Sequence, residues 1–286
     1  MGHDSRRDDR VLAYTRGLSL FIVPFLLVAF VILYLLPTHT ARLWSWTIPV
    51  TMTSMVLASA YLGGAYFFLY VARSHQWHEV GTGFLAVTTF ASLLGVATLL
   101  HWDKFAHTHV AFWLWAGLYF TAPFLVIAAW LLNRRYAAPV AADDVLLRPF
   151  ERLVIGAVGL LALLSGVVMF VAPTSIIDAW PWPLTPLTCR VVGATFCLGG
   201  AGCGVWPDPR WTSVRVMLQV ETVMLGLMVL AAVRAHAEML PRHALAWPLL
   251  IGVLTMLAGS TYLWLTYEHH ARPIAGPRGL DDLGAP

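Results

Sequence analysis

Two ionisable residues stand within long apolar segments and are the first candidates for chemistry. Arg190 and Glu221 each lie about one or two helical turns inside such a segment. A charged side chain is costly within a lipid bilayer and indicates a functional site unless a partner neutralises it. With a rise of about 1.5 Å per residue, the two backbones differ in depth by roughly 10 Å, which the two side chains can span. The sequence therefore predicts an intramembrane ion pair between Arg190 and Glu221.

The histidines near one set of helix ends form the second group of candidates. Imidazole and carboxylate groups are ligands for zinc, copper and haem iron. The spacing of His101, His107 and His109 is not a specific signature, because a helix brings together residues three or four positions apart. Three interpretations stay open: a transition-metal or haem site, a proton-sensing cluster, or interfacial side chains without a special role. His243 is also expected at this outer face, and the candidate ligand or proton site there comprises His39, His101, Asp103, His107, His109 and His236.

Other familiar sites are absent from the sequence. Cys189, Cys197 and Cys203 fall on one predicted helix at separations that forbid disulfides among them. The chain contains no nucleotide-binding loop, no CxxC, no nucleophile elbow and no HExxH motif. The cysteines are therefore interpreted as small packing residues, and no catalytic class is indicated by motif.

The composition identifies the elements that must position these residues. Hydrophobic residues make up 59% of the 286-residue chain and charged residues 12%, against about 45–50% and about 25% in soluble proteins. This balance excludes a soluble enzyme, a nucleic-acid-binding protein and a disordered chain. Apolar segments of about 20 residues are long enough to cross a bilayer as helices. An all-α integral membrane protein is predicted, with transmembrane helices at 17–36, 48–72, 80–100, 110–132, 153–172, 186–206, 213–234 and 246–267.

The distribution of basic residues predicts the orientation. Most of the 18 Lys and Arg residues fall on one side of the predicted helices, including Arg16, Arg73, Arg134 and Arg210. Basic residues in short loops favour the cytoplasmic face. We therefore expect a multi-pass protein of a bacterial plasma membrane with both termini in the cytoplasm. The 13 Trp residues lie near predicted helix ends, which predicts a belt of indoles at each headgroup layer.

The chain is similar to itself. Arg16 aligns with Arg152, and the motif Trp44-Ser45-Trp46 aligns with Trp180-Pro181-Trp182; after a short deletion, Trp77 aligns with Trp211. Such matches predict two four-helix repeats, and an even number of helices gives both copies the same orientation. The expected organisation is a cytoplasmic tail (1–16), a first repeat (17–135), a cytoplasmic linker (136–152), a second repeat (153–270) and a second tail (271–286).

The duplication also bears on the predicted ion pair. The first copy has Ser54 where the second has Arg190, and Val87 where the second has Glu221. Both charges are present in one copy and absent from the other, as expected if they neutralise each other. A pair of this kind either fixes the register of two helices or takes part in proton or substrate movement, and the sequence leaves both open.

The second half carries a resemblance to a known family. Its segments Pro173-Thr174, Pro186-Leu187-Thr188-Cys189-Arg190-Val191-Val192-Gly193-Ala194 and Leu198-Gly199-Gly200 resemble the DoxX-like four-helix membrane proteins. The tract from His101 to His107 resembles that of uncharacterised multi-pass proteins of high-GC bacteria. These resemblances imply a four-helix repeat and imply no specific activity.

Three classes of function remain open at this point. The first is a non-enzymatic accessory, assembly or lipid-interacting component, favoured by short loops and an almost uncharged interior. The second is a transporter for a small molecule or ion that uses the Arg190/Glu221 pair, and the third is a membrane enzyme with a metal or haem at the outer histidines. The expected partners are the lipid bilayer and other membrane subunits, and nucleic acid is excluded.

Overall fold

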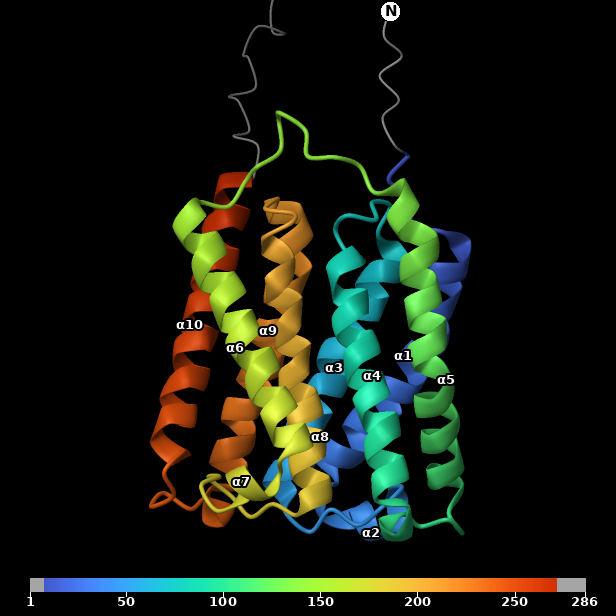
Figure 1. The fold of residues 1–286 in the computed structure, drawn as a ribbon, viewed down its shortest axis with the longest axis vertical. Helices are drawn as coiled ribbons and strands as arrows, with labels where there is room; N and C mark the ends of the chain where they lie inside the picture. The colour runs from blue at the N-terminus through green and yellow to red at the C-terminus, as the bar shows by residue number, and fades with distance from the viewer. Residues whose placement is uncertain (1–7, 272–286) are drawn as a thin grey trace, which may run out of the picture.

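A computed structural model describes residues 8–271 as an all-helical bundle (Figure 1). Most of the two predicted tails, 1–16 and 271–286, lies outside these residues. Within them, eight helices are long and apolar enough to cross a membrane, which confirms the predicted number. These spans are Ala13–Leu35, Thr51–Arg73, Gly81–Leu100, Val110–Tyr136, Pro149–Val171, Pro186–Val205, Trp211–Arg234 and Ala246–His269. The chain is therefore a multi-pass membrane protein.

The helical elements follow one another with short connections. Three of the spans change helix type along their length: the first ends in a π-helical turn at Val31–Leu35, the fourth ends in a 3₁₀ turn at Arg134–Tyr136, and the sixth ends in a 3₁₀ segment, η5, at Leu198–Val205. The α-helices are α1 Ala13–Phe30, α2 Thr40–Leu43, α3 Thr51–Arg73, α4 Gly81–Leu100, α5 Val110–Asn133, α6 Pro149–Val171, α7 Thr174–Ile177, α8 Pro186–Cys197, α9 Trp211–Arg234 and α10 Ala246–Ala271.

The start of α8 illustrates how the sequence fixes a helix end. Pro186 occupies the first helical position, where its missing N–H is not needed. The Thr185 hydroxyl accepts a hydrogen bond from the backbone N–H of Thr188 at 3.2 Å, and the Thr188 hydroxyl interacts in turn with the backbone N–H of Thr185 at 2.8 Å. This reciprocal cap satisfies donors that a helix start otherwise leaves unpaired.

Large apolar side chains cover the outside of the bundle. Phe124, Phe150 and Val171 are each more than 70% exposed. In water, contiguous apolar surface of this kind promotes aggregation, whereas in a bilayer it contacts lipid chains. The exterior of the bundle is therefore suited to lipid, in agreement with the composition.

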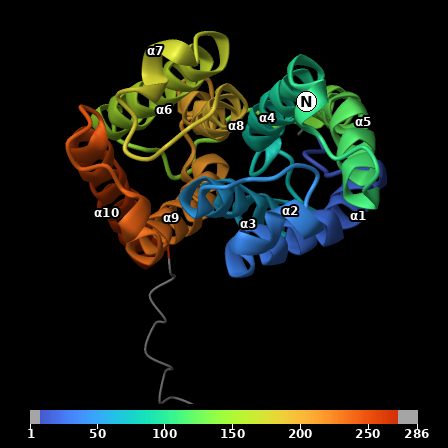
Figure 2. The same cartoon turned by 90° about the horizontal axis from the view of Figure 1, so that it is seen from below.

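The helices form two groups that lie side by side. Figure 2 shows α1, α3, α4 and α5 on one side and α6, α8, α9 and α10 on the other. The two groups meet where α3 packs against α9 and where α4 packs against α8 and η5. The start of α1 and the end of α10 lie at the same face of the bundle (Figure 1), called the terminal face below.

Glycines allow α6 to approach η5, the 3₁₀ continuation of α8, closely. A Cβ atom on Gly159 of α6 would lie 2.7 Å from the carbonyl oxygen of Gly199 and 2.9 Å from Cα of Gly202. Backbones this close leave no room for a side chain. The glycines of η5 therefore act in helix packing, and the 3₁₀ form of η5 is unusual because such segments rarely exceed four residues.

The tryptophan belts expected from the sequence are only partly present. Trp113 and Trp247 are 61% exposed, as expected of indoles at a headgroup layer. Trp46 is 2% exposed, because its ring packs against Trp115 with centroids 4.9 Å apart. The prediction is wrong for the tryptophans that are buried inside the protein near the helix ends, namely Trp44, Trp46, Trp77, Trp115, Trp180, Trp182 and Trp211.

Candidate functional site

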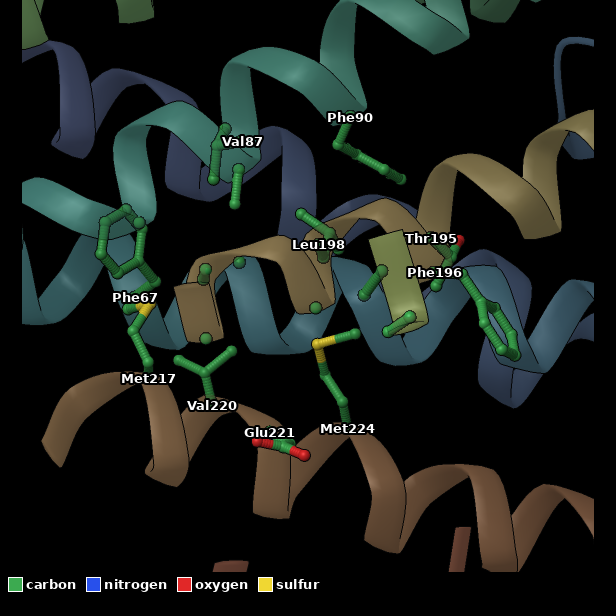
Figure 3. Close-up of a pocket in the computed structure, with 18 of the residues that line it drawn as sticks. Phe67, Val87, Phe90, Thr195, Phe196, Leu198, Met217, Val220, Glu221 and Met224 are labelled. Carbon is green, nitrogen blue, oxygen red and sulfur yellow. The ribbon is translucent and has the colours of Figure 1, made fainter. Parts of the chain in front are cut away.

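An apolar cavity of about 290 Å³ lies between the two groups of helices. Figure 3 shows Val87 and Phe90 of α4 across this cavity from Glu221 and Met224 of α9, with Leu198 of η5 nearby. Its walls come from both groups: α1, α3, α4 and α5 contribute on one side, and α6, α8, η5, α9 and α10 on the other. Ligand sites in proteins are largely apolar clefts with a few polar groups, and they often lie between domains or helices.

Among the described residues that line the cavity, Glu221 is the single Asp, Glu, Lys, Arg or His. The other polar side chains of the wall include the hydroxyls of Tyr61 and Tyr119, which hydrogen-bond to each other at 2.8 Å. The carboxylate of Glu221 is thus the one group of the wall that can carry a charge at neutral pH. An ionisable side chain in such a place is a functional candidate by default.

Arg190 does not reach Glu221 in the structure. Its Nη1 lies 2.7 Å from Nε2 of His101, at the end of α4. Among the residues that the structure describes, neither Arg190 nor Glu221 takes part in an ion pair. The physical reason is the packing of the helices: α8 lies against α4 and α6, whereas α9 lies against α3 and α10, and the cavity opens beside Glu221.

The contact with Arg190 determines the protonation state of His101. A guanidinium only donates hydrogen bonds, so Nε2 of His101 accepts one and the ring is neutral. Burial, followed by the positive charge of Arg190, lowers the pKa of His101 below its usual value. The two residues join α8 to the end of α4 across the interface between the two groups of helices.

The remaining histidines of the candidate outer site share no contact with one another among the described residues. His39 interacts with the hydroxyl of Thr38 at 3.1 Å, and His236 interacts with the carbonyl of Val233 at 3.1 Å. The His107 ring packs on Trp102, with ring centroids 4.9 Å apart. His109 precedes the first residue of α5.

These positions do not form a metal site. Asp103 pairs with Lys104 at 2.7 Å and is exposed. Within residues 8–269, no group of three or more His, Cys, Asp or Glu side chains is arranged to hold a metal ion. His101, His107 and His109 therefore do not form a three-ligand set. The haem and proton-sensing interpretations of these histidines stay predictions.

Sequence reasoning missed a polar network at the terminal face. The carboxylate of Asp9 accepts hydrogen bonds from the backbone N–H groups of His78 and Ala138, each at 3.2 Å, and it also contacts Nδ1 of His78. Nε2 of His78 lies 3.0 Å from the hydroxyl of Thr212. The sequence did contain a signal for the contact between His78 and Thr212. These two residues directly follow Trp77 and Trp211, which align with each other in the two halves.

A second polar cluster lies at the terminal face and is centred on Arg210. This arginine is 5% exposed and donates hydrogen bonds to the Asp208 carboxylate at 2.8 and 2.6 Å. Burial opposes ionisation of Asp208, but the hydrogen bonds from Arg210 and Ser213 outweigh it and lower the pKa of Asp208. Nearby, the backbone N–H groups of Leu147 and Trp211 donate to the carbonyls of Pro209 and Val145. The long linker between α5 and α6 is thereby fixed to the start of α9.

The bundle thus contains an apolar cavity whose described wall includes one carboxylate, and polar clusters lie near the two ends of the bundle. We compared the chain with family models, curated proteins and solved structures, and none of them matches. The resemblance of the second half to DoxX-like proteins stays a prediction.

Proposed function

We propose that this protein binds a small, mainly apolar molecule inside the membrane, in the cavity between its two groups of helices. This is the non-enzymatic, lipid-interacting class of function. The observation that carries the proposal is the cavity itself: about 290 Å³, lined by apolar side chains of both groups and by one carboxylate. A volume of this size is close to the lower end of small-molecule sites, which begin at about 300 Å³.

A matched pair of cavity and surface variants tests the binding proposal. Neopentylbenzene, a neutral apolar probe, is added to the protein in phosphatidylcholine nanodiscs, and thermal unfolding is followed by Trp fluorescence. A ligand that binds only the folded state raises the unfolding temperature. We expect this rise in the unsubstituted protein and in Val168→Phe, which alters an exposed position of α6. It should be lost in Val87→Phe, which fills the cavity. Equal rises in all three proteins would exclude binding in the cavity.

Transport of the same molecule is the second candidate, favoured by a break in one membrane-spanning helix. The α-helical hydrogen bonding of α8 ends at Cys197, and the span continues as the 3₁₀ segment η5. Gly199, Gly202 and Gly204 of this segment line the cavity. Interrupted helices beside a substrate site are typical of transporters, and a 3₁₀ stretch within a helix often indicates a hinge. Uptake of a radiolabelled ligand into proteoliposomes separates transport from binding alone.

We propose that the two groups of helices that enclose this cavity are parallel four-helix repeats. If α3 corresponds to α8 and α4 to α9, a two-fold rotation exchanges the α3–α9 contact with the α4–α8 contact, and both occur. Aligned positions also meet each other, as expected of residues close to a rotation axis: His78 contacts Thr212. An experimental structure in which the first four spans superpose on the last four only after inversion would contradict this arrangement.

The proposed orientation places the terminal face in the cytoplasm of a bacterial cell. Basic residues at this face support it, among them Arg16, Arg73, Arg134, Arg135 and Arg148. Arg residues in short loops favour the cytoplasmic side.

A further inference from the structure

The carboxylate of Glu221 lines an apolar cavity, and within the part of the chain that the structure describes no cation pairs with it. The neighbouring residues on its own helix face, Val220, Met224 and Leu225, are apolar and line the same cavity. A buried carboxylate in such surroundings carries a large desolvation cost unless a positive group or hydrogen-bond donors compensate for it. A positive group or hydrogen-bond donors beside Glu221 must therefore offset this desolvation cost.

The basic side chains of α9 and of α8 contact other groups. On α9, Arg215 donates to the hydroxyl of Tyr70 at 2.7 Å and lies 3.8 Å from Glu268. At the other end of α9, Arg234 donates to the carbonyl of Tyr34 at 2.8 Å. On α8, Arg190 contacts His101. Helices α3, α4 and α10 add no Lys, Arg or His to the residues that line the cavity.

The rest of the cavity wall suits a positively charged apolar molecule. The wall includes the aromatic rings of Phe67, Phe68, Phe90 and Phe196, whose faces attract organic cations. It also includes several methionines, whose flexible thioethers adapt to ligands of different shape. One carboxylate, aromatic faces and methionines together match the recognition chemistry of an ammonium group attached to an apolar body.

We propose that the cavity binds an apolar organic cation and that Glu221 is its counter-ion. This inference rests on the proposed function, because it names the chemical class of the molecule that the cavity takes. The cation supplies the charge that the described residues do not place beside Glu221, and the carboxylate makes the site selective for cations over neutral molecules of the same shape.

Two probes of the same shape test this selectivity. Benzyltrimethylammonium carries a permanent positive charge, and neopentylbenzene is its neutral isostere, with carbon in place of nitrogen. Dissociation constants for both come from the rise in unfolding temperature with probe concentration in phosphatidylcholine nanodiscs. For the unsubstituted protein we expect the cation to bind about tenfold or more tightly than the neutral probe, since a partly desolvated charge pair supplies at least that difference.

Variants of Glu221 locate the source of the preference. In Glu221→Gln, and in Glu221→Met as a second variant of similar size, the preference for the cation should disappear. Glu268→Gln is the matched control, because Glu268 is a carboxylate near the end of α10 that does not line the cavity. It should keep the preference of the unsubstituted protein. Val87→Glu on the Glu221→Gln background should restore the preference, because Val87 lies on the opposite wall.

The outcomes separate the two proposals. If the neutral probe binds and the cation binds no better, the cavity is a binding site and the inference about organic cations is wrong. If the preference survives in both Glu221 variants, Glu221 is not the counter-ion and the inference is again wrong. If neither probe binds, the proposed function fails, and the inference fails with it.

Discussion

His78 and Thr212 contact each other across the interface between the two groups of helices, with 3.0 Å between Nε2 of the imidazole and the hydroxyl oxygen. They are 134 residues apart in the chain. The other ring nitrogen of His78 contacts Asp9, which is 8% exposed and has a positive φ of 39°. A non-glycine residue with this backbone conformation is uncommon and persists where surrounding contacts hold it. The network therefore fixes the segment before α1 to both groups of helices at the terminal face.

The first prediction concerns this network. Asp9→Ala leaves the N–H groups of His78 and Ala138 without their acceptor. We expect a loss of about 1–3 kcal/mol in the free energy of unfolding, because buried donors lose a charged partner. The measurement is thermal or denaturant unfolding in nanodiscs. His75→Ala, at an exposed position of the same loop, serves as the control and should change stability by less than about 0.5 kcal/mol. A similar loss in both variants would argue against a special role for Asp9.

The second prediction concerns the partner of Arg190. Because Arg190 contacts His101 and not Glu221, the effects of Arg190→Met and Glu221→Gln should add to within about 0.5 kcal/mol. The effects of Arg190→Met and His101→Gln should not add, with a coupling of about 0.5–3 kcal/mol. Both double-mutant cycles use unfolding in nanodiscs. Strong coupling between Arg190 and Glu221 would instead restore the ion pair expected from the sequence.

The third prediction follows from the pKa of His101. Burial and the charge of Arg190 lower this pKa in the folded protein, whereas an unfolded histidine titrates near pH 6.5. The unfolded chain therefore takes up the proton first as the pH falls. The stabilising contribution of neutral His101 is complete above about pH 6.5 and is lost below it, toward the folded pKa. Unfolding temperatures should fall on acidification less steeply in His101→Gln than in the unsubstituted protein. The exposed His236→Gln should retain the original slope.

The fourth prediction concerns the packing of α6 on η5. Gly159→Ala places a methyl group 2.7 Å from the carbonyl oxygen of Gly199, so the two helices must separate. We expect a loss of about 1–3 kcal/mol, typical of overpacking. Gly226→Ala is the matched control, because no atom lies within 4 Å of the added methyl group. It should be neutral or stabilising by up to about 1 kcal/mol. Equal tolerance of both substitutions would show that the close approach is not required.

The fifth prediction tests the orientation. Single cysteines are introduced at Thr108 and Ala141, which are exposed and lie in the connections before and after α5, and so at opposite ends of that helix. In intact cells, a membrane-impermeant maleimide should label Thr108→Cys, whereas Ala141→Cys should react only after permeabilisation. The native Cys189 and Cys197 are buried, and the unsubstituted protein measures any background. Labelling of Ala141→Cys in intact cells would reverse the proposed orientation.

The sequence by itself determined the class of protein and its helices. A bilayer requires about 20 apolar residues per helix, and this requirement is local, so eight spans could be read from the chain within a few residues. The candidate residues were also visible, because charged residues inside such spans are few and costly. Arg190 and Glu221 stood out on this ground, and in the structure Glu221 lines the cavity whereas Arg190 contacts His101.

Only the tertiary structure decided which side chains meet. Depth along a helix axis says nothing about the direction in which a residue faces, and neither the Arg190–His101 contact nor the place of Glu221 in the cavity follows from spacing. The same reason explains why Trp46 and Trp211 are buried although their positions near helix ends suit the headgroup layer. Direction and neighbours depend on how eight helices pack against one another, and that packing is set by contacts between residues far apart in the chain, such as His78 and Thr212.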